Sequence, residues 1–206
     1  MHKLQFDYSE SPRQKTQSDQ LEMEVFTNGD KGRAGIERDI LSAYEQNFGA
    51  HFSHFMPELI SAARPGKEAH LRFGICAASK HPLYLENYLA EPVEMLLSKA
   101  VCSRVERHSI AEIGNLSLSH TDNLQQDLMA IAAYCQQQGY RYVVCTATRV
   151  LRMLFLRVGM KPVHLGNAEQ HDAPADGSHW GSYYESRPQI IGGNILLALQ
   201  HLQNGQ

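Results

Sequence analysis

The strongest constraint on the fold is an alternation of strand and helix patterns in the second half of the chain. Period-two alternation, or runs of β-branched and aromatic residues, predicts strands at 109–116, 140–146 and 160–165. Apolar residues at helical spacing predict helices at 123–138 and 149–158. The order strand–helix–strand–helix–strand indicates an α/β domain (mixed α+β) with a central mixed β-sheet and helices on both of its faces.

The rest of the sequence adds elements to this core without strict alternation. Strand or helix patterns recur at 21–27, 36–48, 69–78 and 83–100. A short strand at 188–191 is expected to end in a turn at Gly192 and Gly193. Residues 1–18 are polar and predict a flexible N-terminal extension, so that residues 19–206 form a single domain.

Composition limits the class of protein. A chain of 206 residues with 43% hydrophobic residues and a net charge of −3 favours an ordinary globular domain, with no reason to expect a nucleic-acid partner. The N-terminus lacks the apolar core of a secretory signal, and no apolar run reaches the roughly 20 residues of a membrane span. We therefore expect a cytoplasmic protein without a membrane span.

Metal, disulfide and hydrolase chemistry find little support in the sequence. The four cysteines form no CxxC pair and indicate free thiols in a reducing compartment. His51 and His54 share a spacing that suits a metal, but no third ligand lies nearby, so no metal site is expected. No serine lies in a G-x-S-x-G frame, and no cysteine has a histidine at a readable spacing.

Two polar residues inside an otherwise apolar strand mark the candidate site. Glu112 and Asn115 lie within residues 109–116, where burying a carboxylate or an amide is costly unless the group has a partner or a task. A polar connection follows and leads into the helix at 123–138, whose first N–H groups and dipole attract anions. The stretch 109–124 is therefore the predicted binding or catalytic site.

Three clusters, of which the first lies in this stretch, carry a resemblance to a known family. They are Glu112–Leu116, then Thr146–Thr148 with Leu151 and Arg152, and then Trp180–Tyr184 with Pro188 and Gly192. Over residues 20–197 the chain resembles the thermostable hemolysin family, a distant relative of the GNAT N-acetyltransferases and the acyl-homoserine-lactone synthases. The resemblance implies a GNAT-like fold in which a central strand splays from its neighbour, and the loop and helix that follow bind the pyrophosphate of an acyl thioester.

The same resemblance implies an N-acyltransferase that moves an acyl group to a small amine. The co-substrate would be acyl-CoA or the phosphopantetheine of an acyl-carrier protein, with no tightly bound cofactor. Candidate donor-binding residues are Leu116, Ser117, Leu118, Thr121, Asn123, Thr146, Thr148 and Arg149. Leu116 and Ser117 align with the family position that offers backbone groups to a pantetheine arm. Arg149 has two possible roles: it could bind a phosphate or a substrate carboxylate, or it could be a solvated residue of the first helical turn.

The candidate catalytic residues are Glu112, Asn115, Tyr183 and Tyr184. Glu112 is the candidate general base, because a carboxylate in an apolar strand has a raised pKa. Its alternative is a structural role, either paired with Arg104 or Arg107 or hydrogen-bonded to a neighbouring loop. Asn115 would donate its amide to the acyl carbonyl or the amine, or else bond its own backbone at a bulge.

Two departures from the acetyltransferase pattern bear on this mechanism. Residues 117–123 contain no glycine, whereas acetyltransferases carry a Gln/Arg-x-x-Gly-x-Gly/Ala loop, so a carrier protein stands beside coenzyme A as the possible donor. Phe155 replaces a tyrosine that often protonates the leaving thiolate. Tyr183 or Tyr184 would then supply that proton, or the thiolate would leave unassisted.

Two other functions remain open. The family name suggests a membrane-active hemolysin, against which stand the absence of an export signal and of a strongly basic amphipathic helix. The glycine-free loop and Phe155 also fit a degenerate acyltransferase that only binds a ligand or partner.

Overall fold

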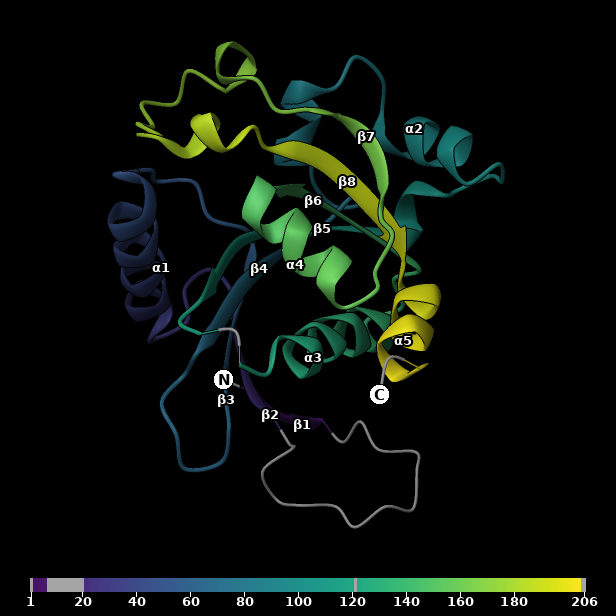
Figure 1. Ribbon diagram of the computed structural model, residues 1–206. Coiled ribbons are helices and arrows are strands. Elements are labelled where there is room, and N and C mark those ends of the chain that lie inside the picture. Colours follow the sequence, from purple (N-terminus) through teal and green to yellow (C-terminus); the bar gives the residue numbers. More distant parts are fainter. Residues whose placement is uncertain (1, 7–20, 121, 205–206) are drawn as a thin grey trace.

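In the computed structural model, which describes residues 2–6, 21–120 and 122–204, one eight-stranded mixed sheet forms the centre of the molecule (Figure 1). Its strand order is β1-β2-β3-β4-β5-β6-β8-β7, and neighbouring strands are antiparallel except β5 and β6, which are parallel. The strands are β1 (His2–Phe6), β2 (Leu21–Phe26), β3 (Glu58–Ala63), β4 (Leu71–Ala77), β5 (Ile110–Leu118), β6 (Tyr142–Ala147), β7 (Val163–Asn167) and β8 (Gln189–Asn194). The α-helices are α1 (Arg33–Phe48), α2 (Val93–Ala100), α3 (Leu124–Gln137), α4 (Arg149–Arg157) and α5 (Ile195–Asn204), and the 3₁₀ turns are η2 (Tyr84–Tyr88), η3 (Arg107–Ser109), η4 (Gln170–Asp172) and η5 (Tyr183–Ser186).

Two hydrophobic cores lie on opposite faces of the sheet. Helices α3, α4 and α5 pack on one face, here called the α3 face, and stand in front of the sheet in Figure 1. Helices α1 and α2 and the turn η2 pack on the other, the α1 face. Successive strand residues alternate between the cores, as a pleated strand requires: Ile110 belongs to the core of α1 and α2, and Ala111 to that of α3. The predicted mixed sheet with helices on both faces is confirmed.

The two central parallel strands pair only over a short length. Residues Ile110–Ile113 of β5 are in register with Tyr142–Cys145 of β6. Beyond this point β5 continues to Leu118 beside β4, while the last residues of β6 pair with β8 alone. The sheet therefore opens between β5 and β6 on the carboxyl side of Ile113, where neither strand has the other as a partner in the described structure.

The predicted elements of residues 109–165 all occur, with shifted ends. The strand that carries Glu112 runs through Leu118, so Ser117 belongs to β5 rather than to the polar turn expected there. The α3 and α4 helices begin and end within one residue of the positions that their apolar spacing indicates. The edge strand β7 starts after Pro162, because proline cannot donate a hydrogen bond to the ladder.

The turn expected at Gly192 and Gly193 is wrong, because β8 continues through both residues. A Cβ atom on Gly192 would lie 2.9 Å from Leu97 Cδ2 and 3.1 Å from Val144 Cγ1. Glycine at this position lets α2 pack closely on the sheet. The pair of glycines is a packing feature of a strand, which a sequence pattern cannot distinguish from a turn.

Two strands of the first half escape the sequence pattern. The segment around Pro57 contains β3, which lies between β2 and β4 in the sheet. Residues His2–Phe6 form β1, antiparallel to β2 at the sheet edge, within the region expected to be an extension. The remainder of that expected extension, residues 7–18, lies outside the described residues. Among the helices described, none combines the length and the apolar character needed to cross a membrane.

Candidate active site

A cavity of about 610 Å³ passes through the sheet where β5 and β6 part. On the α1 face its wall is aromatic, and this part, the aromatic chamber, is lined by Tyr44, Phe48, His54, Tyr84, Tyr88, Trp180 and Tyr183. On the α3 face its wall is aliphatic, and this part, the aliphatic chamber, is lined by Leu128, Ile131, Leu151, Leu154, Met160, Ile191 and Ile195. Strand residues from Glu112 to Leu116 lie between the two chambers. The cavity thus gives one long ligand access to both faces of the sheet.

Glu112 is buried in this wall and is held by backbone donors. Glu112 is only 2% exposed to solvent. One carboxylate oxygen accepts a hydrogen bond from Tyr84 N at 2.7 Å and the other from Leu85 N at 3.1 Å. Burial raises the pKa of Glu112 to about 8, and the two backbone hydrogen bonds oppose that rise. The carboxyl group therefore exchanges its proton in the range where a general base works.

The arginines that could have neutralised Glu112 are committed elsewhere. Arg104 pairs with Glu106 at 2.6 Å. Arg107 pairs with Glu86 at 2.7 Å and with Glu94 at 2.8 Å. Of the two structural roles considered for Glu112, the ion pair is wrong, and the hydrogen bonds to a neighbouring loop are present.

Asn115 forms a bulge that interrupts the pairing of β5 with β4, which resumes at Ser117. Its φ of 49° is left-handed, and the register to β4 shifts between Gly114 and Ser117. The Asn115 side-chain oxygen accepts a hydrogen bond from Met56 N at 2.9 Å. Asn115 is therefore a bulge residue, but it bonds the segment before β3 rather than its own backbone.

The Met56 side chain fills the space left by two strand glycines. A Cβ on Gly114 would lie 2.3 Å from Met56 Cε, and a Cβ on Gly74 would lie 2.5 Å from Met56 Cβ. Both contacts are shorter than carbon atoms tolerate, so these glycines are required for the approach of Met56 to β4 and β5. Met56, Gly114 and Asn115 all line the cavity.

A buried arginine fixes the segment that contains Met56. The Arg33 guanidinium donates to the carbonyl oxygens of Met56 at 2.8 Å, Pro57 at 2.9 Å and Phe26 at 3.2 Å, and pairs with Glu37 at 2.8 Å. A planar group with five donors can satisfy several carbonyls at once, which an ammonium on a flexible chain does less well. Arg33 thereby links the start of α1 to the wall of the cavity.

The tyrosines proposed as proton donors both lie near the aromatic chamber. Tyr183 is buried, with its ring centroid 5.3 Å from those of Phe48 and Trp180, and burial raises its pKa well above the usual 10. Tyr184 is half-buried, and its hydroxyl lies 2.7 Å from that of Tyr88. Burial also raises the pKa of Tyr184. Both phenols therefore keep their protons at neutral pH and can donate them.

A close backbone contact holds η5 against the end of α1. Ser182 N donates to Phe48 O at 2.8 Å, and a Cβ on Gly181 would lie 1.9 Å from that oxygen. His51 and His179 exchange backbone hydrogen bonds of 2.6 and 2.8 Å beside it. The Trp-Gly-Ser-Tyr-Tyr cluster is thus placed over the chamber by a contact that only glycine permits.

The donor-binding candidates divide into two groups. Those that line the cavity, together with Glu112, Asn115 and Tyr183, are Leu116, Leu118, Thr146 and Thr148. Among the residues that the structure describes, Ser117, Asn123, Arg149 and Tyr184 lie outside that lining, and Thr121 is not among the described residues. The Thr148 hydroxyl caps α4 by accepting a hydrogen bond from Leu151 N at 3.3 Å. Arg149 is exposed, which agrees with the alternative that it is a solvated residue of the first helical turn.

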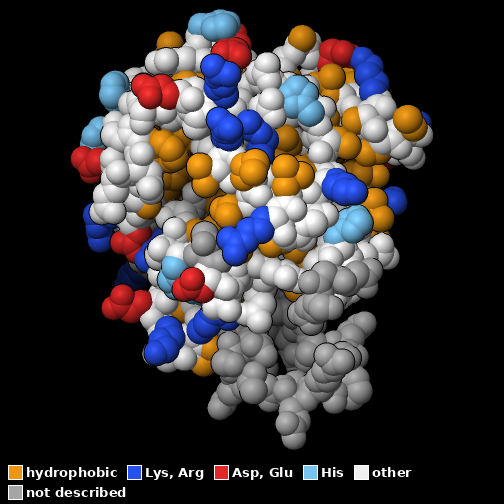
Figure 2. Space-filling model, in the orientation of Figure 1, with side chains coloured by type: hydrophobic (Ala, Val, Ile, Leu, Met, Phe, Trp, Pro, Cys, Tyr) orange, Lys and Arg blue, Asp and Glu red, His pale blue; other side chains and the backbone are white. Residues whose placement is uncertain are grey.

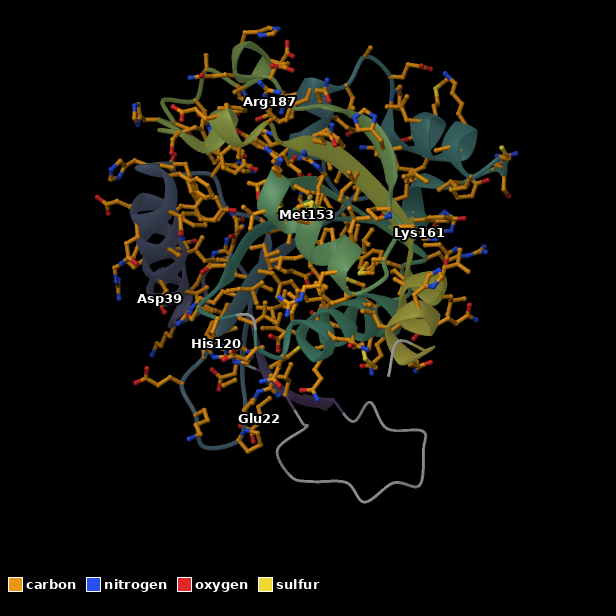
Figure 3. The ribbon with its side chains drawn as sticks, in the orientation of Figure 1. Glu22, Asp39, His120, Met153, Lys161 and Arg187 are labelled. Atoms are coloured by element: carbon orange, nitrogen blue, oxygen red, sulfur yellow. The ribbon has the colours of Figure 1, made fainter. Side chains whose placement is uncertain are left out.

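The start of α3 differs from an open anion site. Asn123 occupies the N-cap position without a side-chain capping bond, and Asp127, buried in the first turn, accepts from His70 Nε2 at 2.9 Å. A carboxylate in the first turn already interacts with the positive end of the helix dipole. His120, labelled in Figure 3, stacks on His70 with ring centroids 4.9 Å apart. No glycine loop cradles phosphates in the described part of this connection, residues 119–120 and 122–123.

Several wall residues were absent from the sequence prediction. Tyr44 and Phe48 come from α1, and Tyr84 and Tyr88 come from η2. Tyr44 and Phe48 are four residues apart on an α-helix, which places both rings on one side of it, and this spacing was the available signal. Tyr84 and Tyr88 lie on a 3₁₀ turn, where the same spacing carries no such signal. The His51 and His54 pair gains no further ligand: the described residues contain no cluster of three groups suited to a metal.

Comparison with solved structures shows the same fold at low sequence identity. The AHL synthase LasI aligns with a TM-score of 0.56 at 12% identity, over 87% of this chain and 94% of that chain. FeeM, an N-acyl amino acid synthase from uncultured soil microbes, gives 0.56 at 12% identity, over 86% and 92%. BjaI, a CoA-dependent acyl-homoserine lactone synthase solved with SAM and isopentyl-CoA, gives 0.53 at 12% identity, over 88% and 87%. The GNAT-like fold implied by the sequence is confirmed.

Sequence comparison gives the family. No curated protein matches the chain significantly. The family profile described as thermostable hemolysin matches residues 26–199. That range runs from the end of β2 into α5 and includes the β5–β6 opening, Glu112 and the aromatic cluster of η5. The chain therefore belongs to the thermostable hemolysin family.

Proposed function

We propose that this protein is an N-acyltransferase that moves an acyl group from an acyl thioester to a small amine. The observation that carries the proposal is the cavity through the sheet between β5 and β6, with the buried carboxyl group of Glu112 in its wall. An aliphatic chamber suits an acyl chain, and a chamber with hydroxyls and one carboxyl group suits a nucleophile that must lose a proton.

The chemistry requires one bond to form and one to break. The neutral amine nitrogen attacks the thioester carbonyl carbon, and collapse of the tetrahedral intermediate breaks the C–S bond and yields an amide and a thiolate. Glu112 takes the proton that the amine nitrogen loses, and a tyrosine hydroxyl, from Tyr183 in the chamber wall, donates to the departing sulfur. The roles of both residues are part of the proposal.

The thioester arm would lie along the free edge of β5. After Ile113 that edge has no strand partner among the described residues, because β6 pairs with β5 no further than Cys145. Peptide groups at an unpaired strand edge bind extended amide chains by the same hydrogen bonds that build a sheet. Leu116 and Leu118 line the cavity here, and Thr146 and Thr148 lie at the end of the facing strand.

Two donors fit this site. BjaI and MesI are described as CoA-dependent synthases, which supports acyl-CoA as the donor here. The glycine-free connection after β5 supports the alternative, an acyl-carrier protein, whose single phosphate needs less of a cradle than the pyrophosphate of coenzyme A. The proposal therefore includes both thioesters and assigns the acyl chain to the aliphatic chamber.

A turnover assay tests the function. Purified protein is mixed with acyl-CoA or acyl-carrier protein of graded chain length and with a panel of small amines, and free thiol and amide products are measured by colorimetry and mass spectrometry. Amide formation with release of one thiol per amide is the expected result. Thiol release without amide, or no reaction with either kind of donor, would contradict the proposal.

A second candidate function, binding to a membrane surface, is favoured by the outer side of α4. Val150, Met153 and Leu156 are 69%, 59% and 57% exposed, and Figure 2 shows a row of hydrophobic side chains with basic ones beside it on this face. Arg149 and Arg157 flank the row at the two ends of the helix. An exposed apolar row with basic neighbours is typical of helices that lie on anionic bilayers. The sequence analysis counted the absence of a strongly basic amphipathic helix against this function, and the exposure of the apolar row is the observation in its favour.

A further inference from the structure

We propose that the acceptor of this acyl transfer is an organic amine without a carboxylate, which binds in the aromatic chamber as its ammonium ion, releases one proton to solvent and then attacks as the neutral amine, whose second proton passes to Glu112. The inference rests on the proposed function and narrows its substrate class. Three independent features of the described residues carry it: the ring surfaces of the chamber, the sign of the charges around it, and the polar atoms left unpaired in its wall.

The ring surfaces are the first feature. Trp180 stands at the centre of the chamber wall, with its ring centroid 5.0 Å from that of Phe52, 5.3 Å from Tyr183 and 6.3 Å from Tyr84. Tyr84 in turn lies 4.8 Å from the ring of His54. The faces of tryptophan and tyrosine rings attract organic cations and remain compatible with an apolar substituent on the same molecule. The chamber therefore suits an alkyl or arylalkyl ammonium ion.

The charges around the chamber are the second feature. Among the described residues that line the cavity there is no arginine, and the single lysine, Lys161, lies on the side of α4 away from α1 in Figure 3. Glu112 supplies the acidic group of the lining, and Asp176 acts from nearby, because its charge contributes to the raised pKa values of Tyr84 and Tyr184. At neutral pH Glu112, whose pKa is about 8, is mostly protonated, so the negative charge near the chamber comes from Asp176; this charge attracts an ammonium ion and repels a carboxylate.

His54 is the one imidazole of the chamber wall, and Asp176 lies near it. Burial raises the pKa of Asp176, but hydrogen bonds from Ser178, with a smaller contribution from His54, lower it overall. A substrate carboxylate placed beside His54 would also face the negative charge of Asp176. The free-energy cost of burying an unpaired carboxylate exceeds the stabilisation that contacts with the rings of the chamber provide. Amino acids are therefore excluded as acceptors, and their decarboxylated counterparts are favoured.

The unpaired polar atoms are the third feature. The Tyr84 hydroxyl, the Trp180 indole N–H and the Ser186 hydroxyl are buried, and none has a hydrogen-bond partner among the described residues. All three residues line the cavity. Buried polar atoms in native proteins have partners as a rule, so a bound molecule is expected to supply them. These neutral groups accommodate one small polar substituent of the amine, such as a hydroxyl, without adding a charge.

The test uses the single tryptophan of the chain as the reporter. Trp180 fluorescence of the full chain is titrated at neutral pH with 2-phenylethylamine, L-phenylalanine and L-phenylalaninamide. The amine and the amide are expected to bind about ten-fold or more tightly than the amino acid, because only the latter carries a carboxylate. Equal or tighter binding of L-phenylalanine, or no binding of any of the three compounds, would overturn the inference.

A pair of variants separates ring contact from the general shape of the chamber. Tyr84→Phe keeps the ring and removes a hydroxyl that lacks a partner, and is expected to bind 2-phenylethylamine within about three-fold of the native chain. Tyr84→Leu removes the ring and is expected to weaken binding about ten-fold. Equal affinity of the two variants would contradict a role for the ring.

Turnover distinguishes the failure of this inference from that of the proposed function. Acylation of L-phenylalanine in preference to the amine would overturn the acceptor class while leaving acyl transfer intact. Selective binding of the amine without amide formation from any thioester would overturn acyl transfer and uphold the selectivity of the chamber.

Discussion

At the scale of single residues, the two adjacent glycines of β8 have opposite surroundings. A Cβ on Gly192 would meet Leu97, Val144 and Leu165 at 2.9 to 3.2 Å, whereas a Cβ on Gly193 would meet no atom within 4 Å. Gly193 lines the cavity opposite Val143. The same small change is therefore expected to disturb packing at one position and to fill the acyl space at the other.

This contrast gives a matched pair of variants. Gly192→Ala is expected to lower the free energy of unfolding by about 1–3 kcal/mol through overpacking. Gly193→Val is expected to change it by about 0.5 kcal/mol or less, and to lower kcat/KM for the longest accepted acyl donor about ten-fold relative to a short one. Denaturant unfolding and a chain-length series measure both effects. If Gly193→Val showed the same preference for acyl-donor chain length as the native chain, the acyl chain would not lie against Gly193.

Glu112 links stability to pH. Its pKa in the folded chain is about 8, above the ordinary value of 4.5, so the folded state binds the proton more tightly than the unfolded state. Its contribution to stability is complete below about pH 4.5 and is lost as the pH rises through about 8, because the folded chain must then bury a charge. Glu112→Gln removes that loss.

The stability of Glu112→Gln relative to the native chain is therefore expected to increase between about pH 5 and about pH 9. Its free energy of unfolding rises relative to that of the native chain, because only the native chain must bury a charge at high pH. Urea titrations at both pH values measure this difference. Parallel stabilities of the two proteins across the range would show that the carboxyl group is ionised without penalty, contrary to the burial described above.

At the scale of elements, α4 turns two different faces to its surroundings. Leu151, Leu154 and Phe155 pack into the α3-face core, while the row of Val150, Met153 and Leu156 is exposed. Figure 3 shows Met153 on the outer side of this helix. Solvent-exposed apolar side chains contribute little to the folding of the chain itself, so their replacement separates surface function from stability.

The membrane candidate makes a prediction for this helix. If α4 lies on anionic bilayers, the triple variant V150S/M153S/L156S is expected to lose about ten-fold or more in affinity for anionic vesicles, with an unchanged melting temperature. Co-sedimentation with vesicles of anionic and of neutral lipid measures the effect, and L151S serves as a core control that lowers stability. Equal binding of the triple variant and the native chain would remove this candidate.

Local sequence patterns predicted the strands and helices near the site, but they did not predict the long-range contacts between them. Glu112 and Asn115 were found because polar groups in an apolar strand are costly, and the following helix because its apolar spacing is regular. The strand β3 was obscured by the proline before it, and the hydrogen bond from Met56 to Asn115 joins residues 59 positions apart. Such a contact depends on the register of the sheet, which no local pattern encodes.

At the scale of the whole molecule, the opening between β5 and β6 joins the two sides of the sheet. Aromatic side chains from α1, η2 and the loop before β8 meet on one side, and aliphatic side chains from α3, α4 and α5 meet on the other. The sequence resemblance implied such a splayed strand, and the structure contains it. The sequence analysis placed Tyr183 and Tyr184 at the site, whereas the rings from α1 and η2 were not predicted, because folding alone brings these distant segments together.

The central claim is that Glu112 accepts the proton of an amine within this cavity. The ratio of native to Glu112→Gln amide-forming rates, measured against pH with one amine and one thioester, tests it most directly, because the ionisation of the amine cancels in the ratio. We expect a ratio that rises with pH, levels off above about pH 8 and reaches about 10²–10⁴. A ratio near one at every pH would contradict it.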